Sequence, residues 1–366
     1  MYLLLFLLIS TFSLQANKPK VKTYVEPLPK NLKCFLGADI GGTKSNVGIF
    51  EVTDNNKAKL LISFHEKTKN IGDFNETMNE LLQYLYDTYG ITVDHACIAA
   101  PGVATKNRDY SSVHGLFDIK TSELLEKTPL KTAIIVNDLF VVGHGLDSVD
   151  PDNIIHLYGD IPEEKNTHDL RAIISAGSGI GSSTITWDSE NKKYITHAGE
   201  AGLLDFAPTN QLEQQFFTHI KNFYGRRNTT YWANVASGSG ITRIYSMLKL
   251  MGKYQDSLNL NDHNPDIILK HPEDELCKAT SNLFFKFFGR FARNYIWSVL
   301  PYGGLYITGG VAANHSELFA TQFAHNYNDP GFQKELRQIP VYLIKDPNVG
   351  IYGAVNYLLQ ELKETN

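Results

Sequence analysis

The sequence has few cysteines and no run of one charge, and both shortages exclude classes of protein. Its three cysteines, Cys34, Cys97 and Cys277, lie far apart and form no C-x-x-C pair. This spacing argues against a zinc site and against a disulfide framework. The net charge is −5, from 34 basic and 39 acidic residues, and no basic helix is evident. We therefore expect no nucleic-acid partner.

Long hydrophobic runs are also scarce, and the longest is at the N-terminus. Residues 1–14 are largely apolar, a length typical of a signal-peptide core and short for a transmembrane helix. However, the run carries no Lys or Arg before it, and Leu14 is large for a cleavage site ending at Ala16. We expect a cytoplasmic protein, associated with a membrane only if this segment is a real anchor. The proline-containing residues 17–30 are interpreted as a linker.

Length and composition are those of a globular protein with two domains. The 366 residues exceed the size at which a single core stops growing. From residue 31 onward, hydrophobic periodicity predicts an α/β protein of two similarly built lobes. A small domain is predicted at 31–138, joined by the C-terminal helix 350–366, and a large domain at 139–349. The predicted strands are 33–38, 45–52, 60–66, 94–100, 132–136 and 305–308; the predicted helices are 74–89, 122–127, 210–224, 241–251, 274–300 and 350–362.

Two glycine-rich loops, at 38–43 and 175–181, are the most informative feature of the chain. Each lies between β-type segments, an arrangement that presents backbone N–H groups to an anion. Two such loops predict a nucleotide held by two lobes, and hence phosphoryl transfer. The first loop is not a P-loop, because Thr43 stands where the lysine is required and Lys44 comes one place later. We instead expect a strand–turn–strand in which Gly41 and Gly42 take positive φ.

Carboxylates near strand ends supply the candidate chemistry. Asp39 enters the first loop, where it suits a water-bound Mg²⁺ or simply caps the turn. Asp138 follows a buried strand, at the edge where open α/β sheets bind ligands. It is interpreted as a general base, with the alternative that it caps a helix beginning at Leu139. Asn137 and Glu200, the latter between two small residues, are suited to hydrogen-bonding sugar hydroxyls.

These motifs resemble those of bacterial-type glucokinases, in the hexokinase and actin-like ATPase superfamily, over about residues 33–362. The resemblance implies a two-lobed actin-like ATPase fold, which is ribonuclease H-like, with an active-site cleft between the lobes. It also implies transfer of the ATP γ-phosphate to the 6-hydroxyl of glucose. The matching segments occur in family order: 38–43, 136–138, 175–181, 199–208, 237–240, 289–291, 304–310 and 339–344.

The resemblance also assigns roles to particular residues. Asp138 corresponds to the general base, while Asn137 and Glu200 correspond to sugar ligands. We expect ATP with a water-rich Mg²⁺ that enters with it, no metal site made by protein groups alone, and a homodimer. The residues that correspond to the nucleotide site are Asp39, Gly41, Gly42, Thr43, Lys44, Ala176, Gly177, Ser178, Gly179, Gly309 and Gly310.

The sugar itself stays open, because the chain departs from the family at the C1–C2 side of the substrate. The family motif G-E-G-G-H has Ala201 and Leu203 at its third and fifth places here, and a sugar-binding glutamate is replaced by Ala233. The spelling D-I-G-G-T-K is also typical of ROK-family sugar kinases, but their cysteine-rich zinc motif is missing. The alternatives are a kinase for another hexose or an amino sugar, and a non-catalytic sugar sensor. Retention of Asp138 favours an enzyme.

Overall fold

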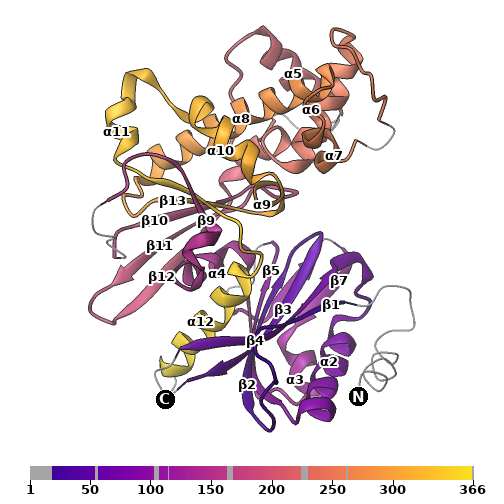
Figure 1. Cartoon of the computed structure of the whole chain (residues 1–366), viewed down its shortest axis with the longest axis vertical. Helices are drawn as coiled ribbons and strands as arrows, with labels where there is room; N and C mark the ends of the chain where they lie inside the picture. The colour runs from indigo at the N-terminus through magenta and orange to yellow at the C-terminus, as the bar shows by residue number, and fades with distance from the viewer. Residues whose placement is uncertain are drawn as a thin grey trace. The chain divides into compact units, whose positions relative to one another are not determined.

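The chain folds into two units, each built around its own six-stranded sheet (Figure 1). Unit 1 comprises Met1–Val149 with Asn348–Asn366, and unit 2 comprises Asp150–Pro347. The first boundary therefore lies after Val149, whereas the sequence analysis placed it after Asp138. The computed structural model describes residues 19–53, 57–102, 107–113, 115–162, 168–223, 230–260 and 263–364.

The apolar N-terminal run lies outside the described residues. Among the helices that are described, none is both long enough and apolar enough to cross a membrane. The segment predicted as a linker, 17–30, contains the strand β1 (Lys20–Thr23), which pairs antiparallel with β4. The alternating apolar pattern that marks a longer strand is missing from these four residues, because β1 lies at the edge of the sheet and is mostly exposed.

Unit 1 begins with an antiparallel meander that continues into two parallel strands. The strand order is β1-β4-β3-β2-β5-β8, in which β5 and β8 run parallel to β2. A separate hairpin is formed by β6 (Tyr110–Val113) and β7 (Phe117–Lys120). The remaining strands are β2 (Lys33–Ile40), β3 (Lys44–Val52), β4 (Ala58–Lys67), β5 (Thr92–Ala100) and β8 (Thr132–Asn137).

Helices cover both faces of the unit 1 sheet. The even-numbered β2 residues Leu36 and Ala38 share a core with α2 (Phe74–Tyr89) and α3 (Thr121–Lys127). Alternate residues of a strand point to opposite faces, so Gly37 faces α12 (Val349–Glu364), whose Ile351 leaves no room for a side chain there. On the same face α12 crosses α4 (Asp138–Gly145) at two glycines, Gly145 and Gly353, where a Cβ on either would overlap the other helix.

Unit 2 carries a second mixed sheet, in the order β12-β11-β10-β13-β14-β9. The strands β10, β13 and β14 are parallel, and the outer pairs are antiparallel. The strands are β9 (Ile154–Tyr158), β10 (Arg171–Ser175), β11 (Ser182–Asp188), β12 (Lys193–Gly199), β13 (Leu305–Thr308) and β14 (Val341–Ile344). The helices are α5 (Gln211–Phe223), α6 (Gly238–Met251), α7 (Pro265–Lys270), α8 (Glu275–Val299), α9 (Gly310–Asn314), α10 (Ser316–Tyr327) and α11 (Gln333–Arg337).

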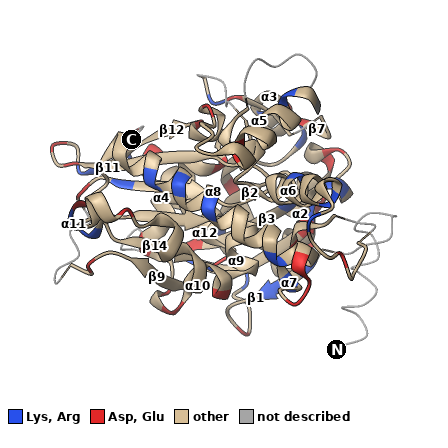
Figure 2. Cartoon of the chain, turned by 90° about the horizontal axis from the view of Figure 1, so that it is seen from above, with Lys and Arg blue, Asp and Glu red and all other residues tan. Residues whose placement is uncertain are grey.

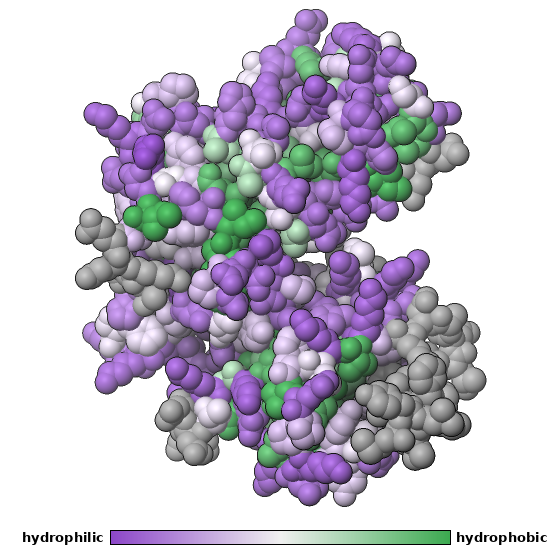
Figure 3. Space-filling model, in the orientation of Figure 1, coloured by the Kyte–Doolittle hydropathy of each residue, from purple (hydrophilic) through white to green (hydrophobic). Residues whose placement is uncertain are grey.

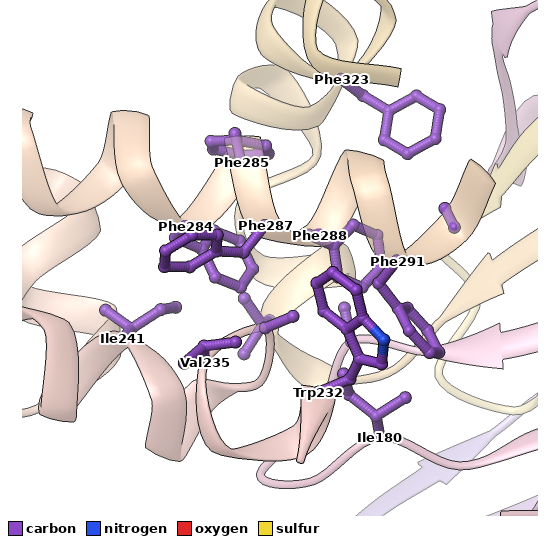
Figure 4. Close-up of a cluster of buried hydrophobic side chains, with 14 of the residues drawn as sticks. Ile180, Trp232, Val235, Ile241, Phe284, Phe285, Phe287, Phe288, Phe291 and Phe323 are labelled. Atoms are coloured by element: carbon purple, nitrogen blue, oxygen red, sulfur yellow. The ribbon is translucent and has the colours of Figure 1, made fainter. Parts of the chain in front are cut away.

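The core of unit 2 is organised by the aromatic residues of α8 (Figure 4). Phe284, Phe288 and Phe291 recur at helical spacing and are fully or almost fully buried. Phe288 meets Phe319 of α10 edge to face, with ring centroids 5.4 Å apart. Full burial of one such side chain contributes roughly 1.5–3 kcal/mol. The aromatic residues of α8 therefore form a large part of the core of unit 2.

The surface of the described residues carries both kinds of charge, and neither dominates. Basic and acidic residues are interleaved along the elements of each unit in Figure 2. The face seen in Figure 3 is mainly hydrophilic in both units, with smaller hydrophobic areas between the polar side chains. The mixture of charges in Figure 2 agrees with the small net charge of −5.

Candidate active site

In unit 1 the first glycine loop is the turn between β2 and β3. The Gly41 amide donates to the Lys44 carbonyl at 2.8 Å, and the Thr68 amide donates to the Thr43 carbonyl at 3.0 Å. The Thr68 hydroxyl also donates to the Gly41 carbonyl at 2.6 Å. The expectation of a positive φ is wrong for Gly41. Glycine is favoured there for another reason, because a Cβ would lie only 3.0 Å from the Lys44 carbonyl oxygen.

Two carboxylates of unit 1 influence each other electrostatically. Burial, and then the charge of Asp138, raise the pKa of Asp39 to about 7. The Asp39 carboxylate packs against the first turn of α12, where a side chain on Gly350 would overlap it. Burial and a second negative charge both disfavour the ionised form of a carboxyl group. A cation nearby would offset the negative charges of both residues. These two residues therefore fit a magnesium ion that arrives with a nucleotide.

The start of α4 bears on the alternative in which Asp138 is a helix cap. The helix begins at Asp138 itself, and its N-cap is Asn137, whose side-chain oxygen accepts from the amides of Leu139 at 3.0 Å and Phe140 at 3.2 Å. The interpretation of Asp138 as the cap of a helix beginning at Leu139 is therefore wrong. The Asp138 carboxylate still accepts from the Leu139 amide at 2.8 Å through Oδ1. Asn137 also donates to the Gly102 carbonyl at 2.9 Å, so its amide is held in place from both ends.

In unit 2 the second glycine loop connects β10 to β11. The Gly181 amide donates to the Ser175 hydroxyl at 2.8 Å, and the Gly177 amide donates to the Gly179 carbonyl at 3.2 Å. Within the part of the chain that the structure describes, no acceptor bonds the amides of Ser178 and Gly179. A Cβ added to Gly179 would meet nothing within 4 Å. The protein's own packing therefore does not require glycine at this position, whereas close approach of a ligand to the backbone would.

The segment after β13 lies directly against this second loop. The Ala176 carbonyl accepts from the amides of Val311 at 2.9 Å and Ala312 at 3.3 Å, while the Ala176 amide donates to the Thr308 carbonyl at 2.7 Å. Gly309 has a φ of 102°, and a Cβ there would lie 2.7 Å from the Ala176 carbonyl. By contrast, a Cβ on Gly310 would meet open space. The two nucleotide segments predicted from the sequence are thus brought together.

A third segment supports the same loop, and the sequence analysis gave it no role. The Gly238 amide at the start of α6 donates to the Gly177 carbonyl at 2.7 Å, and the Ser239 amide donates to the Ser178 carbonyl at 3.3 Å. The serine at the N-cap, Ser237, accepts from the Gly240 amide at 3.1 Å. The S-G-x-G spelling was visible in the sequence, but its contact with the loop depends on the fold of unit 2.

Glu200 follows β12 and is exposed. Its segment is tied to the second loop, because the Ala201 amide donates to the Ser182 hydroxyl at 3.0 Å. Gly202 packs so closely on Ile180 that no side chain would fit. Leu203, at the place of the family histidine, has 55% of its side chain exposed. An apolar group therefore lies at the position where the resemblance implies a histidine.

Arg290 of α8 holds the continuation of the Glu200 segment. The sequence analysis included it in the matching segment 289–291 but gave it no role. It donates to the Glu213 carboxylate and to the Thr209 hydroxyl, each at 2.9 Å, and to the Ala207 carbonyl at 3.1 Å. Its guanidinium also lies 5.1 Å from the ring centroid of Trp232. Burial by itself would raise the pKa of Glu213, but hydrogen bonds from Thr209 and Arg290 lower it to about 2.

Metal coordination by protein groups alone finds no support in the described part of the chain. There, no three His, Cys, Asp or Glu side chains are arranged to hold an ion. The two nearby carboxylates, Asp39 and Asp138, could supply only part of an octahedral magnesium shell. Water and phosphate oxygens would have to supply the rest.

Known proteins resemble this chain in sequence and in fold. A family model described as glucokinase matches residues 36–361. The glucokinase of Nostoc punctiforme is 26% identical over 341 residues, which cover 87% of this chain and 97% of that protein. A glucokinase from Balamuthia mandrillaris, crystallised with glucose, has a TM-score of 0.72 at 19% identity, covering 89% and 94% of the two chains. A ROK-family glucokinase from Streptomyces griseus, in complex with glucose and AMPPNP, has a TM-score of 0.58 at 17% identity, covering 89% and 99%.

The two mixed sheets have the actin-like ATPase fold of the solved glucokinase structures, which confirms the predicted α/β fold class. The match of the family model over most of the chain goes further. This chain belongs to the glucokinase family, and it is an ATP-dependent phosphotransferase of the glucokinase type. The ROK structures share the fold, but the family that matches is not theirs.

Proposed function

We propose that the chain transfers the γ-phosphate of ATP to the 6-hydroxyl of glucose, with Asp138 as general base. The observation that carries this proposal is the start of α4, where Asn137 satisfies the helix cap and Asp138 follows at the carboxyl end of the parallel strand β8. A sugar hydroxyl is a weak nucleophile, and a positioned carboxylate accepts its proton as the bond to phosphorus forms.

Asn137 and Glu200 are proposed to bind the sugar. In Asn137 the carbonyl oxygen is occupied by two helix amides, and one N–H is occupied by Gly102. The second N–H is the group that can reach a hydroxyl. Glu200 is exposed and presents two carboxylate oxygens, which suit a pair of neighbouring hydroxyls.

The nucleotide is proposed to contact both glycine loops. The amides of Ser178 and Gly179, together with the open backbone at Gly310, support phosphate and adenosine contacts in unit 2. The segment Gly41–Lys44 and the Asp39 carboxylate are proposed to act in unit 1. A magnesium ion, when bound with ATP, would neutralise the charge that develops between the phosphates.

A different preferred sugar is the second candidate, and exposed Leu203 is the observation that favours it. A coupled assay that measures ATP turnover over a panel of hexoses and amino sugars separates the possibilities. Turnover with glucose supports the first proposal, and a stronger response to another sugar supports the second. If no sugar supports ATP turnover although sugars still bind, the proposal of a kinase is wrong and a non-catalytic sugar sensor is favoured.

Two further proposals rest on the family resemblance alone. We propose a homodimer, which sedimentation of the purified protein tests, and a cytoplasmic location, which fractionation of cells that express the full chain tests. The predicted division, 31–138 with 350–366 and 139–349, is proposed with one change, which is a small domain that also includes α4. The packing of α4 on α12 supports extending the small domain through α4.

A further inference from the structure

A chain of hydrogen bonds crosses unit 1 from β3 to the start of α12. His65 is bonded through Nδ1 to the Asn46 side-chain oxygen and through Nε2 to the Ser63 hydroxyl, each at 2.7 Å. The Ser63 hydroxyl lies 3.3 Å from the Tyr24 hydroxyl. The side-chain amide of Asn348 then donates to the Tyr24 hydroxyl at 2.9 Å. Four side-chain contacts therefore join five residues that are widely separated in the sequence.

Both ends of this chain lie beside Asp39. At one end, Asn46 is the direct cross-strand partner of Asp39 in the register of β2 and β3. At the other end, the Asn348 carbonyl accepts from the Tyr352 amide at 2.9 Å and so begins α12. Two residues further on, Gly350 packs against the Asp39 carboxylate. The two ends of this series of five residues, called the ring below, thus flank Asp39.

The donors and acceptors of the ring follow one consistent direction. Asn348 donates to Tyr24, which can donate to Ser63, which in turn can donate to His65 Nε2. His65 then donates from Nδ1 to Asn46. This direction requires a neutral imidazole, and burial together with the charges of Lys22, Lys44 and Lys20 lowers the pKa of His65. Each hydroxyl both accepts and donates, so removing one would interrupt the whole series.

Tyr24 is the member of the ring that the family does not account for. It follows β1, ahead of the residues 36–361 that the family model matches. Its amide donates to the Leu61 carbonyl at 2.9 Å, and Lys22 lies over its ring at 4.7 Å from the centroid. The aromatic ring of Tyr24 is therefore held in place without help from its hydroxyl. The Tyr24 hydroxyl therefore contributes its hydrogen bonds to Ser63 and to Asn348, and Asn348 is only 5% exposed.

We propose that the Tyr24 hydroxyl is a positioning group for the phosphoryl-transfer site: it fixes Asn348, and thereby the first turn of α12 against Asp39. The same helix packs on α4, the helix that begins at Asp138, through Gly353 and Gly145. A displaced α12 would consequently move both carboxylates. This inference rests on the roles proposed above for Asp39 and Asp138.

The test compares Tyr24→Phe with the wild-type full-length enzyme. A displacement of about 1 Å can lower the rate about a hundredfold. We expect a smaller displacement when the hydroxyl is lost, so kcat should fall about tenfold and the KM for MgATP should rise. The KM for glucose should change less than the KM for MgATP, since Asn137 is also held by the Gly102 carbonyl and Glu200 belongs to unit 2. Tyr86→Phe is the matched control, because Tyr86 is 57% exposed on α2 and should leave all constants unchanged.

A double-mutant cycle with Asn348→Ala identifies the route. If Tyr24 acts through Asn348, the double variant should be no slower than the slower single variant. Additive losses would overturn this route. Wild-type kinetics for Tyr24→Phe, with or without a lower melting temperature, would show a merely structural hydroxyl. The Asp138→Asn variant is measured in the same assay. If it is active, the proposed function is wrong. If it is inactive while Tyr24→Phe has wild-type kinetics, only the positioning role of Tyr24 is wrong.

Discussion

Asn137 and Asp138 divide two tasks at one helix start, and this division leads to the first prediction. Asp138→Asn should lower kcat by at least about a hundredfold, because general-base help typically contributes 10²–10⁴-fold. Sugar binding, measured by calorimetry, should survive, since Asn keeps the shape and Asn137 still caps α4. Asp87→Asn on the exposed face of α2 is the control. Near-normal turnover of Asp138→Asn would contradict the assignment of the base.

A second prediction separates glycines that the fold needs from glycines that a ligand needs. Gly310→Ala should keep or slightly raise the melting temperature, because its Cβ meets open space and Ala lowers the entropy of the unfolded chain. It should nevertheless raise the KM for ATP. Gly309→Ala should instead unfold at lower temperature, since it combines a positive φ with contact against Ala176. Equal stability losses in both variants would show that Gly310 also serves packing.

At the scale of residues, the sequence showed where glycines are important better than it showed why they are needed there. The glycines of both loops were found from their spacing, yet the positive φ expected at Gly41 is not observed. A glycine pattern records only that a side chain is missing. Whether a carbonyl such as Lys44 or an incoming phosphate fills the space depends on neighbours that only the fold supplies.

At the scale of elements, Arg290 joins α8 to the segment that follows Glu200. The pKa of Glu213 is about 2 in the folded state and about 4.3 in an unfolded chain. A lowered folded-state pKa stabilises the protein fully above the unfolded value, and this contribution is lost as the pH falls from about 4.3 towards 2. Acid titration of wild-type stability should therefore show a loss in this window.

Glu213→Gln is the variant that tests this pair. Removing one partner of a buried ion pair costs about 3–5 kcal/mol, so the free energy of unfolding at pH 7 should fall by an amount of this order. The acid-dependent loss between about pH 4.3 and 2 should become shallower, because the group that titrates there is gone. An exposed acid, Glu364→Gln, serves as control. An unchanged acid profile would show that other carboxylates dominate.

The Glu200 segment carries a prediction about specificity. Sites that hydrogen-bond a substrate hydroxyl reject analogues that lack it, whereas apolar positions discriminate weakly. Because Leu203 and Ala233 replace a histidine and a glutamate, 2-deoxyglucose should be phosphorylated with kcat/KM close to that of glucose. Leu203→His should then restore part of the preference for glucose. A preference near a hundredfold in the wild-type enzyme would show that other residues, with Asn234 as the first to test, hold the sugar there.

Regular elements were predictable where one periodicity persists. The helix predicted at 74–89 is α2, Phe74–Tyr89, because its apolar residues repeat on one face and Asp73 caps it. The strand predicted at 305–308 is β13. The edge strand β1 and the hairpin of β6 and β7 were missed, since four-residue strands with exposed positions carry no clear alternation. The role of Arg290 could not be predicted, because its partners come from other segments of the chain.

At the scale of the whole molecule, each unit carries one glycine loop, which is why two lobes could be predicted. The boundary between them could not be found from composition. It depends on α4 packing against α12, two helices that are more than 200 residues apart and meet through glycines. Such a contact leaves no local signal in the chain.

The last prediction concerns the metal and the stability of the whole chain. Chelation should abolish activity and added Mg²⁺ should restore it, because phosphoryl transfer needs charge neutralised between the phosphates. The melting temperature of the nucleotide-free protein should not change, since the described residues hold no cluster able to bind an ion by themselves. With MgATP present, chelation should lower the melting temperature towards the nucleotide-free value. A large drop without nucleotide would instead reveal a structural metal, and the carboxylates Asp39 and Asp138 would be the first ligands to replace.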